Sequence, residues 1–205
     1  MPRKILHIDA SAQGERSESM RLSDDFIQRW KMRHPDDEII QRDIVDNPLP
    51  HIDGLILDSM MTPPIQRTPE QRAVAAQYEE LVQEFLDADV LVLGVPMYNF
   101  TIPSTLKAWI DHITVPGRTF EYAEEGPRGL VDGKQIYILS TRGGFYGDGP
   151  MDHQVNYLRT LFGFLGIEDI QIIQAEGLNV SPETRDQSIE AAHTQIQETL
   201  AQAAA

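Results

Sequence analysis

The most constraining feature of this sequence is a regular alternation between short apolar runs and segments of helical periodicity. The first apolar run lies at residues 5–8, and the segment after it places three large side chains four residues apart: Leu22, Phe26 and Trp30. A spacing of four residues puts side chains on one face of a helix. Because the same change of pattern recurs along the chain, strands and helices are expected to alternate.

Four more strands are expected, at residues 38–42, 90–95, 136–139 and 170–173. The run at 90–95 is apolar throughout, which is typical of a central parallel strand covered on both faces. Alternating strands and helices form a parallel sheet with helices on both faces. Right-handed crossovers favour the strand order 2-1-3-4-5. We therefore predict an α/β fold with a doubly wound, five-stranded parallel sheet.

Two later helices have recognisable starts. Thr68 is followed by a proline and, at the third helical position, by Gln71, which is a capping pattern. Residues 181–183, Ser-Pro-Glu, open the final helix. Residues 47–69 are rich in proline and have little periodicity, so a long connection is expected there. No internal repeat or linker divides the chain, and residues 1–205 are predicted to form a single domain.

The net charge of −15 at pH 7 restricts the partners of the chain. So acidic a surface repels nucleic acids and anionic membranes, and neither is expected as a partner. The absence of cysteine excludes disulfides, thiolate nucleophiles and cysteine-bound metals. The histidines show no spacing such as H-E-x-x-H, so no metal site is predicted. With neither a signal-peptide pattern nor a membrane-spanning run, a cytoplasmic location is expected.

Three loops are expected to meet at the carboxyl edge of the sheet, where this topology binds ligands. The first loop, DASAQGERSESM, covers residues 9–20 and carries Ser11, Ser17 and Ser19 ahead of a helix. Hydroxyl groups and free amides at a helix N-terminus favour a bound phosphate. The loop contains neither G-x-G-x-x-G nor G-K-[ST], so it is not a dinucleotide fingerprint or a Walker loop. Simple capping of the helix by Ser17 or Ser19 is the alternative.

The second loop, PMYNF at residues 96–100, ends the most apolar strand. Pro96 fixes the exit from the strand, so the backbone of the next residues can lie along the edge of a planar ring. Asn99 offers both a donor and an acceptor between two aromatic side chains. An ordinary helix start with tucked aromatics is the alternative. The expected position at the switch point of the sheet favours a ligand.

The third loop, TRGGFYGDGP, covers residues 141–150 and follows the fourth strand. Gly143 and Gly144 allow the backbone to approach a ligand closely. Their amides could stabilise negative charge, as the amides of oxyanion holes do. A flexible glycine turn is the alternative for this loop alone. The three loops together are more specific, because all fall where the topology binds its ligand.

Beyond these loops, the sequence resembles the FMN-dependent NADH–azoreductases, which are flavodoxin-like quinone reductases of bacteria. The resemblance covers nearly the whole chain. Its most specific parts are the PMYNF-x-I-P-x-x-L-K-x-W-I-D segment, the [ST]-R-G-G loop, and the Y-L-x-x-x-x-GF-x-GI run before AEG. The resemblance implies a flavodoxin-like fold.

The resemblance also implies that twelve residues bind FMN non-covalently. One group would bind the phosphate and the ribityl chain: Ser11, Ser17, Glu18 and Ser19. A second group would line the isoalloxazine ring: Met97, Tyr98, Asn99 and Phe100. A third group would hold the pyrimidine end of the ring: Thr141, Arg142, Gly143 and Gly144. Thr141 stands where the family often has serine, which keeps the hydroxyl group.

The activity that the resemblance implies is a two-electron, ping-pong reduction by a homodimer with its sites near the subunit interface. Hydride from NADH or NADPH would pass to the flavin, and a quinone or azo compound would then receive the electron pair. No catalytic side chain is expected, because the flavin carries the chemistry. Amides of Gly143 and Gly144, helped by Arg142, could stabilise the reduced flavin. A bulky β-branched residue in place of Gly144 should therefore weaken FMN binding.

A flavodoxin-type electron carrier is the main alternative, and an acidic charge would suit it. Flavodoxins carry a T-x-T-G-x-T phosphate loop, whereas this chain has SAQGERSES. A binding or regulatory protein that has lost its flavin is a third reading. The sequence identifies neither the physiological acceptor nor the preference between NADH and NADPH.

Overall fold

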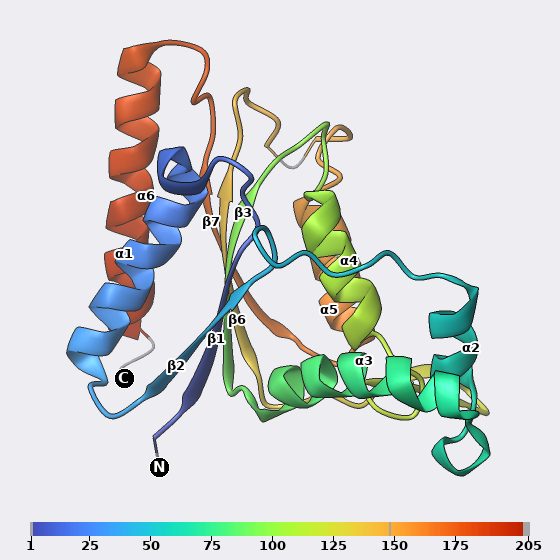
Figure 1. The fold of residues 1–205 in the computed structure, drawn as a ribbon. Helices are drawn as coiled ribbons and strands as arrows, with labels where there is room; N and C mark the ends of the chain where they lie inside the picture. Colours follow the sequence, from blue (N-terminus) through green and yellow to red (C-terminus); the bar gives the residue numbers. More distant parts are fainter. Residues whose placement is uncertain (1, 148, 203–205) are drawn as a thin grey trace.

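A computed structural model describes residues 2–147 and 149–202 of the chain. Its centre is a five-stranded sheet (Figure 1) in which every neighbouring pair is parallel. The strands are β1 (Lys4–Asp9), β2 (Glu38–Asp43), β3 (Val90–Pro96), β6 (Gln135–Thr141) and β7 (Asp169–Ala175). They lie in the order β2-β1-β3-β6-β7. The predicted order of five parallel strands, 2-1-3-4-5, is therefore confirmed.

Helices lie on both sides of this sheet in Figure 1. On one side are α1 (Glu18–Arg33) and α6 (Pro182–Gln202). On the other side are α3 (Pro69–Asp87), α4 (Ser104–Ile113) and α5 (Val155–Phe164). Because side chains of a strand alternate between the two faces, each side of the sheet has its own core. Phe26 and Trp30 belong to the core under α1, and Phe85 and Trp109 belong to the opposite core.

The central strand β3 is buried along its whole length, as its apolar sequence predicts. Its one glycine, Gly94, lies directly under the start of α1. A Cβ atom at this position would lie 2.2 Å from Asp9 Oδ1 and 3.1 Å from the carbonyl oxygen of Ser19. The missing side chain therefore lets the first turn of α1 pack against β1 and β3. This packing brings the start of α1 to the carboxyl edge of the sheet.

The connection between β2 and α3 is more ordered than the sequence indicates. A long connection is present as predicted, but it contains helix α2 (Gly54–Met61) and a 3-10 turn at Pro64–Gln66, which the sequence pattern did not reveal. The Asp53 carboxylate accepts a hydrogen bond of 2.8 Å from the Ile56 amide and caps α2. Ile56 and Met60 share a buried cluster with Tyr78 of α3. Helix α2 has only eight residues, and its buried apolar face is too short to produce a recognisable periodicity in the sequence.

A small antiparallel sheet lies outside the main one, and the sequence pattern did not reveal it. It consists of β4 (Phe120–Ala123) and β5 (Gly126–Gly129). A Cβ atom on Gly129 would lie 2.2 Å from the carbonyl carbon of Leu165, just after α5. The hairpin therefore packs backbone to backbone against the end of α5.

The predicted capping pattern at the start of α3 is confirmed. The Gln71 amide donates to Thr68 Oγ1 at 3.1 Å, and the Thr68 amide donates to Gln71 Oε1 at 2.9 Å. Because Thr68→Ala removes one of these bonds, it should lower the free energy of unfolding by about 1 kcal/mol. Urea denaturation measures the change. The control is Thr68→Ser, which keeps the hydroxyl; an equal loss in both variants would contradict the capping role.

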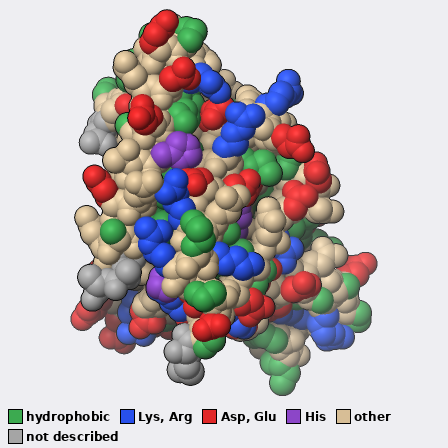
Figure 2. All heavy atoms as spheres, turned by 90° about the vertical axis from the view of Figure 1, so that its left-hand side faces the viewer, with side chains coloured by type: hydrophobic (Ala, Val, Ile, Leu, Met, Phe, Trp, Pro, Cys, Tyr) green, Lys and Arg blue, Asp and Glu red, His purple; other side chains and the backbone are tan. Residues whose placement is uncertain are grey.

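The surface over α1 and α6 is charged but mixed in sign. Figure 2 shows acidic and basic side chains interspersed over this face. Two polar contacts join the helices here: Arg185 of α6 donates to Glu18 of α1, and His193 Nδ1 lies 2.8 Å from Asp25 Oδ2. Within the described residues, no helix is long and apolar enough to cross a membrane.

Candidate functional site

The carboxyl ends of β1, β3 and β6 bring the three loops to one edge of the sheet, where they border a cavity of about 230 Å³. Predicted residues from all three loops line this cavity: Ser11, Ser17, Glu18, Met97, Tyr98, Thr141, Arg142 and Gly143. Four predicted residues lie outside its wall: Ser19, Asn99, Phe100 and Gly144. The loops therefore meet as the topology predicts, although not every chosen side chain faces the cavity.

Hydroxyl groups of the first loop form a connected group at the start of α1. Ser17 Oγ accepts a hydrogen bond of 3.3 Å from the Met20 amide, so Ser17 caps the helix as well as lining the cavity. Ser19 is fully buried, and its Oγ lies 3.0 Å from Ser17 Oγ. Ser11 Oγ lies 3.4 Å from the hydroxyl oxygen of Tyr98. This last contact ties the first loop to the second.

The second loop makes a tight turn with two residues in the left-handed region. The φ angles are 48° at Asn99 and 71° at Phe100. Across the turn, the amides of Tyr98 and Thr101 each donate to the other residue's carbonyl, at 2.9 and 3.1 Å. Positive φ at both central residues is typical of a type I′ turn, which usually contains glycine. A phenylalanine there costs roughly 1–2 kcal/mol, and strain of this kind is concentrated at functional sites.

The third loop is held in place by the segment that follows β7. The amides of Gly177 and Asn179 donate to the carbonyl oxygens of Gly144 and Gly143, each at 2.9 Å. Among the described residues, the amides of Gly143 and Gly144 themselves donate to no group of the chain. The loop is therefore fixed through its carbonyl groups while these two amides stay available to a ligand.

Arg142 turns its side chain into the protein. Its fully buried guanidinium donates to Asp152 at 2.8 Å and to Glu176 at 3.3 Å. The Glu176 carboxylate also accepts from the amides of Tyr146 and Gly147, both at 3.0 Å. The guanidinium therefore joins the ends of β6 and β7 to the glycine loop. Because the side chain is fully buried and paired with two carboxylates, it supports the loop instead of presenting its charge to a ligand.

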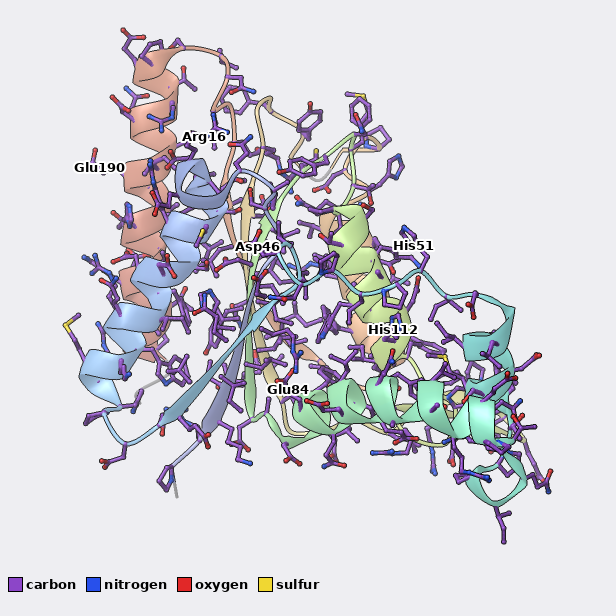
Figure 3. The ribbon with its side chains drawn as sticks, in the orientation of Figure 1. Arg16, Asp46, His51, Glu84, His112 and Glu190 are labelled. Carbon is purple, nitrogen blue, oxygen red and sulfur yellow. The ribbon has the colours of Figure 1, made fainter. Side chains whose placement is uncertain are left out.

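Two arginines on the cavity wall were not selected from the sequence. Arg16 belongs to the first loop, and Figure 3 shows it beside the start of α1. Arg185 comes from α6 and donates to Glu18, a residue 167 positions away. Cations beside serine hydroxyls suit a phosphate group. Arg16 could have been noticed within the serine loop, whereas only the fold brings Arg185 to it.

Gly143 and Gly144 have different surroundings. A Cβ atom on Gly143 would lie 2.4 Å from Nδ2 of Asn179, which also lines the cavity. A Cβ atom on Gly144 would instead meet the ring of Tyr146 at 3.2–3.3 Å. A side chain at position 143 should therefore disturb this loop more than one at position 144, and Gly143 is the better position at which to test the contribution of the loop to ligand binding.

The histidines do not gather at the cavity. His112 is buried in α4, with its Nδ1 2.8 Å from the carbonyl oxygen of Ala108, so it is a structural residue. Figure 3 shows His51 and His112 near α4, on the opposite side of the sheet from Arg16. These two histidines are therefore poor candidates for proton donors at this site.

Comparisons with known proteins agree with this architecture. A sequence profile for a family with a flavodoxin-like fold matches residues 3–200. An FMN-dependent NADH:quinone oxidoreductase of Azotobacter vinelandii is 46% identical over 201 residues, which cover 98% of this chain and 99% of that protein. The similarity therefore extends over both chains from end to end.

Solved structures agree as well. An azoreductase of Bacillus anthracis superposes with a TM-score of 0.90 at 30% identity, covering 97% of this chain and 98% of the other. An FMN-dependent NADH-azoreductase of Bacillus anthracis, solved in complex with FMN, gives a TM-score of 0.88 at 29% identity, covering 99% and 100%. The chain therefore belongs to the family of the FMN-dependent NADH:quinone oxidoreductases and has its flavodoxin-like fold.

Proposed function

We propose that this protein is an enzyme, an FMN-dependent oxidoreductase that uses NADH or NADPH to reduce quinones and azo compounds. The observation that carries the proposal is the cavity at which three separate loops present eight of the twelve residues expected to bind FMN. The names of the relatives point the same way, to quinone reduction in Azotobacter vinelandii and to azo reduction in Bacillus anthracis. These names favour a reductase over a flavodoxin-type carrier.

The first loop has the donors that the FMN phosphate needs. Ser11 and Ser17 offer hydroxyl groups at the N-terminus of α1, where the helix dipole favours an anion. Arg16 and Arg185 add positive charge from two sides. Glu18 carries the same sign of charge as a phosphate, and its bond to Arg185 suggests that it holds this arginine in place. The chemistry of these donors fits a phosphate.

The second and third loops suit a planar ring. Met97 and Tyr98 would form one wall, and Thr141 and the free amide of Gly143 would hydrogen-bond the pyrimidine edge. The amide of Gly144, just outside the cavity wall, is also free to reach the ring. The exposed turn at Asn99 and Phe100 would lie next to the outer part of the ring. When bound, FMN supplies the transfer of an electron pair. The role of the chain is then to orient the ring and to hold the substrate about 3–3.5 Å from it.

We also propose that the chain is a single, doubly wound domain that works in the cytoplasm as a homodimer, without nucleic acid or membrane partners. Large side chains that remain exposed support a protein partner: Phe100 is 45% exposed, Phe145 is 61% exposed and Tyr122 is 74% exposed. Phe100 also packs edge to face against Tyr146, at 5.9 Å between ring centroids. Phe100 and Phe145 lie within two residues of Tyr98 and Gly143, which line the cavity, so this part of the exposed aromatic surface would suit a site that lies near a subunit interface.

Steady-state kinetics on the FMN-loaded protein tests the proposed function. We expect rapid oxidation of NADH in the presence of benzoquinone, with the parallel-line pattern of a ping-pong reaction. A panel with NADPH, other quinones and azo dyes would give the substrate preference. Electron transfer that needs a second protein would favour the carrier instead. A preparation that stays colourless after added FMN would overturn the flavin assignment altogether.

A further inference from the structure

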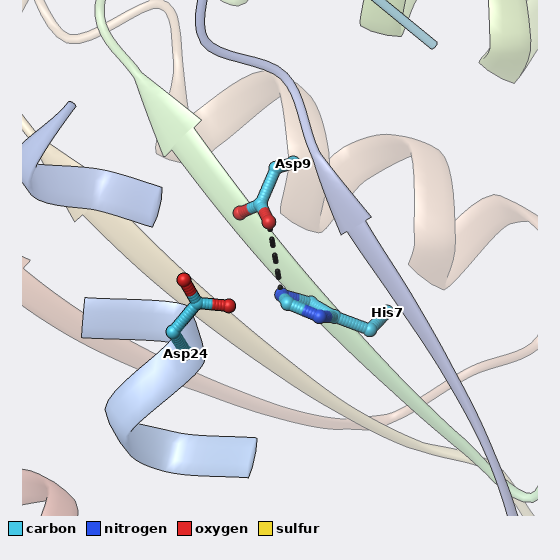
Figure 4. A group of neighbouring side chains, drawn as sticks. All are labelled: His7, Asp9 and Asp24. Carbon is cyan, nitrogen blue, oxygen red and sulfur yellow. Dashed lines mark ion pairs between the residues drawn. The ribbon is translucent and has the colours of Figure 1, made fainter. Parts of the chain in front are cut away.

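Three polar side chains meet under the first loop, between β1 and α1. His7 and Asp9 are two residues apart on β1, so they lie on the same face of the sheet, and Asp24 of α1 packs over them. Figure 4 shows the three side chains turned toward one another. One ligand-type atom from each residue can be chosen so that all lie within 4.8 Å of one another. We refer to these three residues as the His7 cluster.

Two atoms of the His7 cluster are buried without a hydrogen bond. His7 is 2% exposed, and among the described residues neither its Nε2 atom nor Asp9 Oδ2 has a hydrogen-bond partner. The two atoms lie only 3.2 Å apart, so the distance suits an ion pair but the directions do not suit a hydrogen bond. A buried polar atom without a partner is costly and calls for an explanation. Here the two atoms face each other, as the dashed line in Figure 4 shows.

The surroundings of the His7 cluster favour a cation. Two carboxylates face one imidazole, so the group is negative whether His7 is neutral or protonated. Ser23 Oγ donates to the other oxygen of Asp9, Oδ1, at 2.6 Å. A hydrogen bond of this kind orients a carboxylate that binds a metal ion and leaves its second oxygen free to do so.

The distances also fit a metal ion. Nitrogen and oxygen ligands about 2.0–2.2 Å from a tetrahedral zinc ion lie about 3.3 Å from each other. The 3.2 Å between His7 Nε2 and Asp9 Oδ2 matches this separation. Asp24 is only partly buried, so a rotamer change can bring its carboxylate closer by the remaining distance of at most about 1.5 Å. Asp9 also borders a surface cavity that is lined by Met20 and Gln41.

We propose that His7, Asp9 and Asp24 form a binding site for a divalent cation of the first transition row, such as Zn²⁺ or Co²⁺. An imidazole nitrogen among the ligands favours these ions over Mg²⁺ and Ca²⁺, which prefer oxygen ligands alone. Water molecules complete the coordination on the side of Asp24. A bound ion joins the end of β1 to α1, next to the loop that starts at Ala10. This site is distinct from the flavin site, because none of its three residues lines the cavity assigned to FMN.

The test uses the full-length protein without a histidine tag, after removal of metals with a chelator. Titration with Co²⁺, followed by its visible absorption spectrum, should show one bound ion per chain with nitrogen and oxygen ligands. Zn²⁺ should displace the Co²⁺ signal, and millimolar Mg²⁺ should not. In His7→Gln and in Asp24→Asn the affinity for Co²⁺ should fall by more than about tenfold.

The matched control is Asp25→Asn, the next residue on α1. Asp25 bonds to Arg29 and His193 and is not part of the His7 cluster, so its replacement should leave Co²⁺ binding unchanged. Circular dichroism establishes whether each variant is folded. If His7→Gln is not folded, the test relies on Asp24→Asn, because Asp24 is partly exposed. No saturable binding by the wild-type chain, or equal binding by the wild type and Asp24→Asn, would overturn the proposal.

Discussion

Replacing Arg142 with methionine is expected to lower the free energy of unfolding by roughly 3–5 kcal/mol, because the change leaves the buried carboxylate of Asp152 without its cation. Asp152 is 1% exposed and lies 2.8 Å from the guanidinium, and the side chain of Arg142 is fully buried. Methionine has a similar length but offers no hydrogen bonds. Urea denaturation of the metal-free, FMN-free protein measures the loss directly.

The same substitution should also weaken FMN binding. Glu176 holds the amides of Tyr146 and Gly147 and is itself held by Arg142, so the glycine loop loses its support when the guanidinium is removed. Fluorescence titration with FMN, under conditions where the variant is still folded, measures the effect. If Arg142 instead presented its charge to the flavin, affinity would fall while stability stayed nearly unchanged.

An exposed arginine provides the control for Arg142. Arg128 pairs with Glu121 on the small hairpin, where its side chain is 68% exposed. Exposed pairs are worth about 0–1 kcal/mol, so Arg128→Met should change stability by no more than this amount. Arg142→Lys keeps the charge but not the forked donor geometry, and it should recover only part of the loss. Equal effects at the two arginines would contradict the role of burial.

The parts of the fold that could be predicted from sequence are those decided by neighbouring residues. The run from Val90 to Val95 is buried on both faces, and this alone marks a central parallel strand. The capping of α3 by Thr68 depends on residues within one turn. In contrast, α2 is stabilised by contact with Tyr78, and the β4–β5 hairpin packs on Leu165. Such distant contacts leave no local pattern.

The candidate site also contains residues that could be predicted from the sequence and residues that could not. The topology brings the three predicted loops to one edge, so residues at the strand ends, such as Ser11 and Thr141, lie on the cavity wall. The direction of a long side chain could not be predicted in this way. The guanidinium of Arg142 points into the protein because it pairs with carboxylates from two other segments. Arg185 comes from the last helix. Helix packing likewise brings Asp24 to His7, so the spacing of residues in the sequence could not indicate the metal site proposed above.

The glycine loop gives the second large effect: Gly143→Ala should weaken FMN binding by about 5- to 150-fold. A Cβ atom at this position would lie 2.4 Å from Nδ2 and 3.1 Å from Cγ of Asn179. Relief of such overpacking costs roughly 1–3 kcal/mol, which corresponds to that range of affinity. The control is Gly163→Ala in α5, where a new Cβ atom would meet nothing within 4 Å. Fluorescence titration with FMN measures both variants.

A double variant separates the clash from any other effect of the new methyl group. Asn179→Ala removes the atoms that the Cβ of residue 143 would meet, while the backbone bond from the Asn179 amide to the Gly143 carbonyl remains. If the clash distorts the loop, Gly143→Ala combined with Asn179→Ala should bind FMN more tightly than Gly143→Ala alone, by an amount that a double-mutant cycle gives. If the affinity is not recovered, the methyl group does not act through its clash with Asn179, and this explanation of the effect is wrong.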